Sequence, residues 1–95
     1  HAGRRFVSPA TLDELARLVR DGGEVRIATD DVTYLRWTLE HATAHPCFRW
    51  TARCQADWRA PPADWVPTRY EAKAVREGRP PFYLCFERRP RAENP

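Results

Sequence analysis

The sequence lacks any long apolar run. Its 95 residues contain no stretch of 18 apolar residues without a charge, so a membrane-spanning helix is excluded. The first 30 residues also lack the succession of basic, apolar and small residues that marks a signal peptide. We therefore expect a soluble, cytoplasmic protein with no membrane partner.

Cysteine is scarce and has no metal-binding spacing. Cys47, Cys54 and Cys85 are odd in number and form no C-x-x-C pair, which favours reduced thiols over a disulfide framework or a zinc site. We interpret them as small packing residues. His41 and His45 lie four residues apart on an expected helix, but no third ligand accompanies them, so we propose no metal.

Lysine is nearly absent, because 15 of the 16 basic residues are arginine and only Lys73 is lysine. The net charge of +3 is a weak indication of an anionic partner, since clustered cations attract phosphate. A chain of this length with 42% hydrophobic residues can bury one modest core, so we expect one domain or part of one. Because it begins at His1 and not at Met, we expect it to be part of a longer protein.

The first half of the chain has the pattern of a helix, a strand and a second helix. Ser8 and Pro9 are a helix cap and a first helical residue, and apolar residues at helical spacing predict a helix over about 9–20. Gly22 and Gly23 would end it. Alternating residues predict a strand over 24–29 that ends at Asp30, followed by a helix over about 32–44.

The second half begins with an expected strand over 48–52 and continues into a proline-rich loop of about a dozen residues around 58–67. Thr68 to Glu71 matches a capping box and predicts a short helix to about Glu77. The segment 82–86 is apolar on both faces, as in a strand inside a sheet. We expect one α/β unit over 1–90 and a disordered tail over 91–95.

Several short motifs, taken in order, resemble the bacterial tRNA (guanine-N7-)-methyltransferases. No single motif is specific, but the ordered set is, and it covers most of the chain. The matching residues are Arg4 to Val7, Gly22 to Glu24, Ala28 to Asp30, Tyr34, Ala44 to Pro46, Phe48, Thr68 to Glu71, Lys73, Gly78, Arg79 and Phe82 to Arg88.

The resemblance implies an α/β fold: the C-terminal half of a Rossmann-like (class I) S-adenosylmethionine-dependent methyltransferase, with a mixed sheet. Residues 82–88 would be the antiparallel last strand, inserted beside its neighbours, and 24–29 and 48–52 would be the fifth and sixth strands. The family's glycine-rich cofactor loop, its acidic ribose-binding residue and its P-D-P-W segment would precede His1. No G-x-G occurs here, so we expect the residues that bind the S-adenosylmethionine cofactor to lie upstream.

By the same resemblance, the family's guanine-binding aspartate aligns with Asp30, and its four-residue nucleoside-binding segment aligns with Thr68, Arg69, Tyr70 and Glu71. An alternative is that Asp30 or Asp31 only caps the helix that follows. A capping box would likewise explain Thr68 and Glu71 by itself. The family's His-Asn-Lys-Arg-Arg run reads His1-Ala2-Gly3-Arg4-Arg5 here, which leaves His1, Arg4 and Arg5 as candidate tRNA contacts.

The chemistry that the resemblance implies is methyl transfer to N7 of the variable-loop guanine of tRNA. N7 carries a free lone pair, so we assign no residue as a catalytic acid or base, and orientation would dominate catalysis. A carboxylate of Asp30 or Glu71 could accept the guanine N1–H and N2–H groups. Tyr34, Trp58, Trp65 and Tyr70 could stack on an extruded base, although packing roles are commoner.

Two other functions fit the same sequence pattern. One is a non-catalytic RNA-binding module that shares this half-fold. The other is a methyltransferase of the same fold that acts on a small molecule or a protein. Whatever its function, an isolated half of this fold would expose a sheet edge and an apolar face that normally meet the other half, and two copies could dimerise through them.

Overall fold

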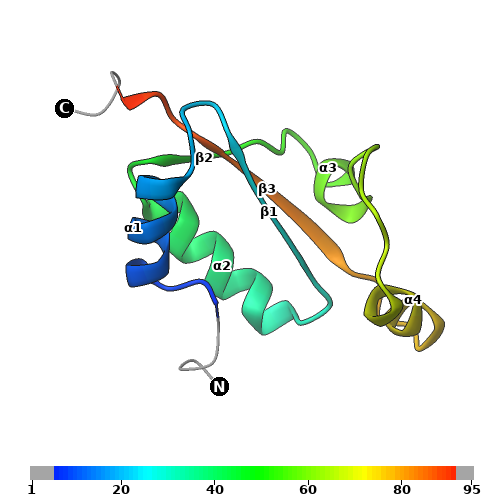
Figure 1. The fold of residues 1–95 in the computed structure, drawn as a ribbon. Coiled ribbons are helices and arrows are strands. Elements are labelled where there is room, and N and C mark those ends of the chain that lie inside the picture. Colours follow the sequence, from blue (N-terminus) through cyan, green and yellow to red (C-terminus); the bar gives the residue numbers. More distant parts are fainter. Residues whose placement is uncertain (1–5, 92–95) are drawn as a thin grey trace.

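The computed structural model describes residues 6–91, which form a three-stranded sheet with four helices (Figure 1). Their order is α1 (Pro9–Leu18), β1 (Glu24–Thr29), α2 (Val32–Ala44), β2 (Phe48–Trp50), α3 (Ala56–Arg59), α4 (Arg69–Arg76) and β3 (Phe82–Arg88). His1, Arg4, Arg5 and the end of the expected tail, residues 92–95, lie outside the described residues. No helix within 6–91 is long and apolar enough to cross a bilayer.

The last strand lies in the middle of the sheet. The strand order is β1-β3-β2, and β3 runs antiparallel to both neighbours, with Ile27 opposite Leu84 and Trp50 opposite Phe86. This confirms that the apolar segment is an inner strand, antiparallel and inserted between its neighbours. Because each residue of an inner strand is covered on both sides, Tyr83, Leu84 and Phe86 are all buried.

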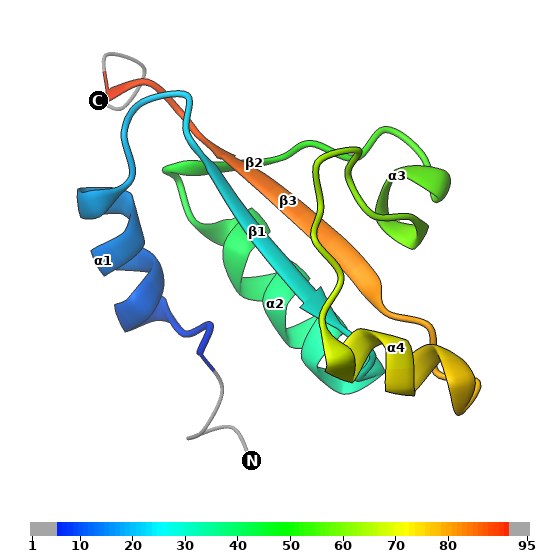
Figure 2. The ribbon, with the colours of Figure 1, turned by 45° about the vertical axis from the view of Figure 1, so that its right-hand side comes forward.

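One core joins the sheet to α1 and α2, which lie on the same side of it (Figures 1 and 2). Leu84 and Phe86 are at most 1% exposed. Burying side chains of this size contributes roughly 1.5–3 kcal/mol each. The other buried members are Val7, Leu12, Ala16, Leu35, Ala42 and Phe48. α4 lies across the carboxyl end of β1, at the far end of the molecule from α1 (Figure 2).

The start of α1 is as predicted, because Ser8 caps it and Pro9 is its first residue. The expected end at residue 20 is wrong, since the helix stops at Leu18 and Val19 already has extended backbone. Gly22, with φ of 76°, makes the turn into β1. The predicted bounds of β1 and α2 are confirmed.

Three further expectations need correction. β2 ends at Trp50, not at residue 52, because the pairing with β3 stops at Phe86. α3 was not expected; it forms where the Asp57 carboxylate accepts a hydrogen bond from the Arg53 amide at 2.8 Å. Cys54 is exposed, so the packing interpretation is wrong for that cysteine.

Arg88 and Arg91 attach the end of β3 to α1. Arg88 is only 5% exposed, and its Nε donates to the Ala16 carbonyl at 2.8 Å. Arg91, in the segment expected to be a disordered tail, donates to the carbonyls of Ala16 and Arg17 and pairs with Asp21. These guanidinium groups satisfy carbonyls at the helix end that have no partner within the helix.

Candidate functional site

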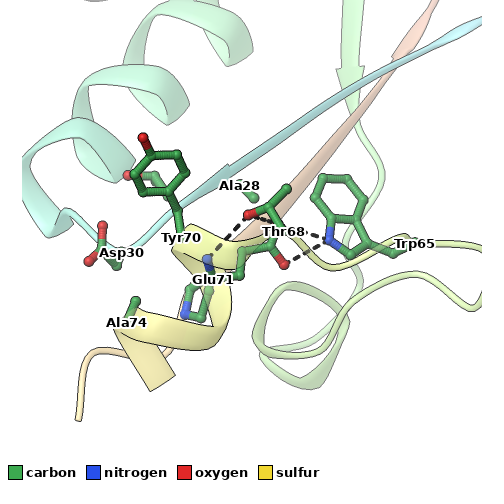
Figure 3. A pocket seen from close by; sticks show the side chains of 9 residues that line it. Ala28, Asp30, Trp65, Thr68, Tyr70, Glu71 and Ala74 are labelled. Carbon is green, nitrogen blue, oxygen red and sulfur yellow. Dashed lines mark hydrogen bonds between the residues drawn. The ribbon is translucent and has the colours of Figure 1, made fainter. Parts of the chain in front are cut away.

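A pocket of about 340 Å³ lies at the carboxyl end of β1, within the size range of small-ligand sites. Three segments line it: the end of β1, the loop and helix around α4, and the residue before β3. Figure 3 shows Asp30 at one end of the lining and Trp65 at the other, with Tyr70, Glu71 and Thr68 between them. The remaining lining residues are Ala28, Thr29, Ala74 and Pro81.

Asp30 and its neighbour Asp31 have different roles. The Asp31 carboxylate caps α2 by accepting hydrogen bonds from the amides of Thr33 and Tyr34, at 2.8 and 3.2 Å. Asp30 takes no part in this cap, and it lines the pocket. The capping alternative therefore applies to Asp31, which leaves Asp30 available to a ligand.

The Asp30 carboxylate pairs with Arg79, which lies between α4 and β3. The Arg79 guanidinium contacts Oδ2 of Asp30 through one nitrogen and Glu77 through another. Within the described residues, no hydrogen bond reaches Oδ1 of Asp30. Asp30 is therefore anchored through one oxygen, while the other remains available as an acceptor.

Other side chains hold the Glu71 carboxylate. The capping box predicted from the sequence would instead have it accept a hydrogen bond from the Thr68 amide. Thr68 does cap α4, since its hydroxyl accepts from the Glu71 amide at 3.2 Å. The Glu71 carboxylate does not return to the Thr68 amide. It accepts instead from the indole Nε1 of Trp65, at 3.2 Å to Oε1 and 2.9 Å to Oε2 (Figure 3).

Tyr83 adds a donor from the sheet to this carboxylate. Its hydroxyl lies 3.4 Å from Oε2 of Glu71, and its ring meets the Trp65 ring edge-on at 5.5 Å. Burial, followed by the negative charge of Glu71, raises the pKa of the Tyr83 phenol above its usual range. The phenol is thus kept in the form that can donate to the carboxylate.

The pocket brings together four of the five residues predicted to bind substrate: Asp30, Thr68, Tyr70 and Glu71. Arg69 is not among the lining residues and lies exposed on α4. The binding roles of all five stay predictions. The proposed tRNA contacts His1, Arg4 and Arg5 lie outside the described residues and stay predictions as well.

The four aromatic candidates divide into two pairs. Tyr34 packs against the core and accepts a hydrogen bond from the Val7 amide, and Trp58 packs against Phe82 with ring centroids 5.5 Å apart. Trp65 and Tyr70 line the pocket, where Tyr70 is 87% exposed. Only the second pair is placed to meet a ligand in this pocket.

Two residues of this site, Arg79 and Tyr83, were not predicted from the sequence. Arg79 appeared only within a matching motif, and Tyr83 only as part of an apolar strand. A tyrosine in an inner strand could have signalled the contact, because a buried hydroxyl needs a hydrogen-bond partner. No pattern in the sequence indicates which partner that is. Within residues 6–91, no cluster of three or more His, Cys, Asp or Glu side chains is arranged to hold a metal ion.

Comparison with known proteins identifies the family. A family described as "Putative methyltransferase" matches residues 1–84. The tRNA (guanine-N(7)-)-methyltransferase of Rhodospirillum rubrum is 64% identical over 95 residues, which are all of this chain and 37% of that relative. The proteins of the same name from Mesorhizobium japonicum and Azorhizobium caulinodans are each 52% identical, over 94% and 93% of this chain.

The chain thus spans less than two fifths of the length of these curated relatives, 37–38% in each case. The matched family covers all of the pocket lining, from Ala28 to Pro81. The pocket lining therefore lies wholly within the matched segment. On this match, the chain belongs to that methyltransferase family.

Proposed function

We propose that this chain forms the guanine-binding side of an S-adenosylmethionine-dependent tRNA (guanine-N7-)-methyltransferase. The observation that carries the proposal is the single pocket that joins Asp30, from the end of β1, to Glu71, from α4. Two carboxylates in one pocket suit a ligand with several hydrogen-bond donors, such as the pairing edge of guanine. The names of the relatives point to the same base.

We place this chain in a Rossmann-like, class I methyltransferase fold. The support is the strand order β1-β3-β2, in which the last strand runs antiparallel between two others. In such α/β sheets, ligands bind outside the carboxyl ends of the strands. Asp30 directly follows β1 at that end, where a binding residue is expected.

The described residues do not fit S-adenosylmethionine. The pocket lining contains no glycine, and the described glycines lie in turns outside it, so no backbone cradle for a cofactor is formed within 6–91. We therefore propose that residues outside this chain hold the methyl donor. The role of the residues described here is to bind and orient the base.

The two carboxylates differ in their free acceptor capacity. Glu71 already accepts hydrogen bonds from Trp65 on both oxygens. It also accepts weak hydrogen bonds from Thr68 on Oε1 and from Tyr83 on Oε2. A carboxylate has about four acceptor positions. Among residues 6–91, Asp30 accepts a hydrogen bond only from Arg79, on Oδ2. Asp30 is therefore the carboxylate that accepts from guanine N1–H and N2–H, while Glu71 contributes mainly its charge.

Both charges also favour the product. Methylation at N7 makes the guanine cationic, and a fixed negative charge stabilises positive charge as it develops. The attacking N7 lone pair needs no proton removed, so Asp30 acts by orientation and charge and not as a base. Holding the base in one geometry is the larger part of this contribution.

The test is methyl transfer from labelled S-adenosylmethionine to unmodified tRNA by the protein expressed from the complete gene. Asp30→Asn keeps the size of the side chain but removes its charge. We expect this variant to lose about ten- to a hundredfold in kcat/KM, since a hydrogen bond to a charged group is worth about 1.5–3 kcal/mol. Turnover equal to that of the unsubstituted protein would overturn the role of Asp30.

The neighbouring residue supplies the matched control. Asp31→Asn makes the same chemical change one residue away, and asparagine caps helices as well as aspartate does, so activity should stay near that of the unsubstituted protein. A second substrate, tRNA without the variable-loop guanine, should accept no methyl group. If no tRNA is methylated but tRNA still binds, the alternative of a non-catalytic RNA-binding module is supported instead.

A further inference from the structure

α4 carries three cations on one face. Arg69, Lys73 and Arg76 are spaced i, i+4 and i+7, which places them within an arc of about 60° and along about 10 Å of helix at 100° and 1.5 Å per residue. All three residues are exposed. We call this set the α4 basic ridge.

Acidic side chains do little to neutralise the α4 basic ridge. Within the described residues, Arg69 and Arg76 form no ion pair, whereas Arg26, Arg49 and Arg79 all do. Lys73 lies 3.9 Å from Glu77, with side chains 64% and 46% exposed. A salt bridge as exposed as this one contributes between zero and about 1 kcal/mol to stability. The ridge thus presents nearly its full charge to solvent.

The ridge lies next to the pocket on the same short helix. The residues of α4 that line the pocket are Tyr70, Glu71 and Ala74, which face about 100–200° around the helix axis from Arg69. Of these three lining residues, Tyr70 is the nearest to the ridge around the helix axis, and it is 87% exposed. The ridge and the pocket lining therefore occupy adjoining faces of α4.

We infer that the α4 basic ridge binds backbone phosphates of the RNA strand that delivers the guanine, an inference that rests on the proposed function. A base can enter the pocket only with its own sugar and phosphates at the mouth. Arginine and lysine meet RNA phosphates through charge and hydrogen bonds that position the strand without reading its sequence. The ridge sets affinity and register, while Asp30 recognises the base.

The inference is tested by tRNA binding, measured over a range of salt concentrations, with the protein from the complete gene. Arg69→Ala combined with Arg76→Ala removes the two unpaired cations. We expect at least about tenfold weaker binding near physiological salt. The slope of log affinity against log salt should fall by roughly 0.7–0.9 per lost phosphate contact. The loss should appear in the Kd and the KM for tRNA.

The matched control is Arg17→Ala combined with Arg20→Ala, which removes the same formal charge from the end of α1 and the turn that follows it, at the far end of the molecule (Figure 1). Its affinity and salt slope should stay near those of the unsubstituted protein. Arg69→Lys combined with Arg76→Lys should keep most of the slope, because lysine retains the charge. Alanine favours helix, so the ridge variant should fold, which circular dichroism checks.

Three results would overturn the inference: an unchanged salt slope in the Arg69/Arg76 variant, an equal loss in the α1 control, or a fall in kcat with unchanged affinity. In each of these cases the unsubstituted protein could still methylate tRNA, and the proposed function would stand. If the unsubstituted protein neither methylates nor binds tRNA, both proposals fail together.

Discussion

The indole N–H of Trp65 points at both carboxylate oxygens of Glu71, at 3.2 Å and 2.9 Å. Trp65 belongs to the proline-rich loop and Glu71 to the first turn of α4, so this contact joins the loop to the helix across the pocket. A donor that contacts both oxygens of a carboxylate fixes the orientation of that group. Trp65 is thus a positioning residue for Glu71.

Trp65→Phe tests this relationship, because it keeps an aromatic ring but removes the N–H. We expect kcat/KM for tRNA methylation to fall by about tenfold or more, as a charged hydrogen bond is worth about 1.5–3 kcal/mol. Trp58→Phe is the matched control, since the Trp58 ring packs against Phe82 and not against a carboxylate. Equal losses in both variants would mean that Trp65 acts only by packing.

Arg79 holds the other carboxylate, Asp30, and also contacts Glu77. Arg79→Ala should lower kcat/KM by about tenfold, because Asp30 loses the partner that fixes the direction of its carboxylate. Arg79→Lys should keep part of the activity that Arg79→Ala loses. Stability should change by less than about 1 kcal/mol, since the pair is half-exposed. Faster turnover in Arg79→Ala would show instead that Arg79 competes with the base.

The Tyr83 phenol should lose its proton at a higher pH than an ordinary tyrosine does. Burial and the nearby Glu71 charge raise its pKa above the usual value near 10. A raised pKa in the folded state stabilises the protein below pH 10, and that contribution is lost as the pH climbs through the raised value. Ultraviolet difference spectra should show a tyrosine step above pH 10 that is missing in Tyr83→Phe. A step at the ordinary position would contradict the Glu71–Tyr83 contact.

Replacing Thr38 by an apolar residue of similar size should stabilise the fold. The Thr38 side chain is fully buried on α2, and its hydroxyl has no hydrogen-bond partner among residues 6–91. An unsatisfied buried polar group costs about 1–3 kcal/mol. Thr38→Val should therefore raise the free energy of unfolding by on the order of 1 kcal/mol, as measured by urea denaturation.

Thr43→Val is the comparison for that measurement. Thr43 lies on the same helix, but its hydroxyl is exposed and donates to the Leu39 carbonyl. Its replacement should leave stability within about 0.5 kcal/mol, as is usual for surface positions. Destabilisation by Thr38→Val would show that the hydroxyl has a partner after all.

The sequence alone was enough to predict the local elements. The bounds of β1 and α2, the Ser8 cap of α1 and the Thr68 cap of α4 were all predicted, and the apolar run at 82–86 was recognised as an inner strand. Each of these features depends on residues within a turn or two, because caps and hydrophobic alternation act over short distances. The sequence also named four of the residues that line the pocket, through the family resemblance.

Only the tertiary structure decided how those residues are held. α3 is stabilised by a local hydrogen bond, from the Arg53 amide to Asp57, and by the packing of Trp58 against Phe82, which has no local signature. Trp65 and Tyr83 donate hydrogen bonds to Glu71, Arg79 pairs with Asp30, and Arg69 is not among the residues that line the pocket. Arg79 and Asp30 are 49 residues apart. Such contacts depend on how β1 and β3 pair and on where α4 packs across them, which no periodicity within either segment specifies.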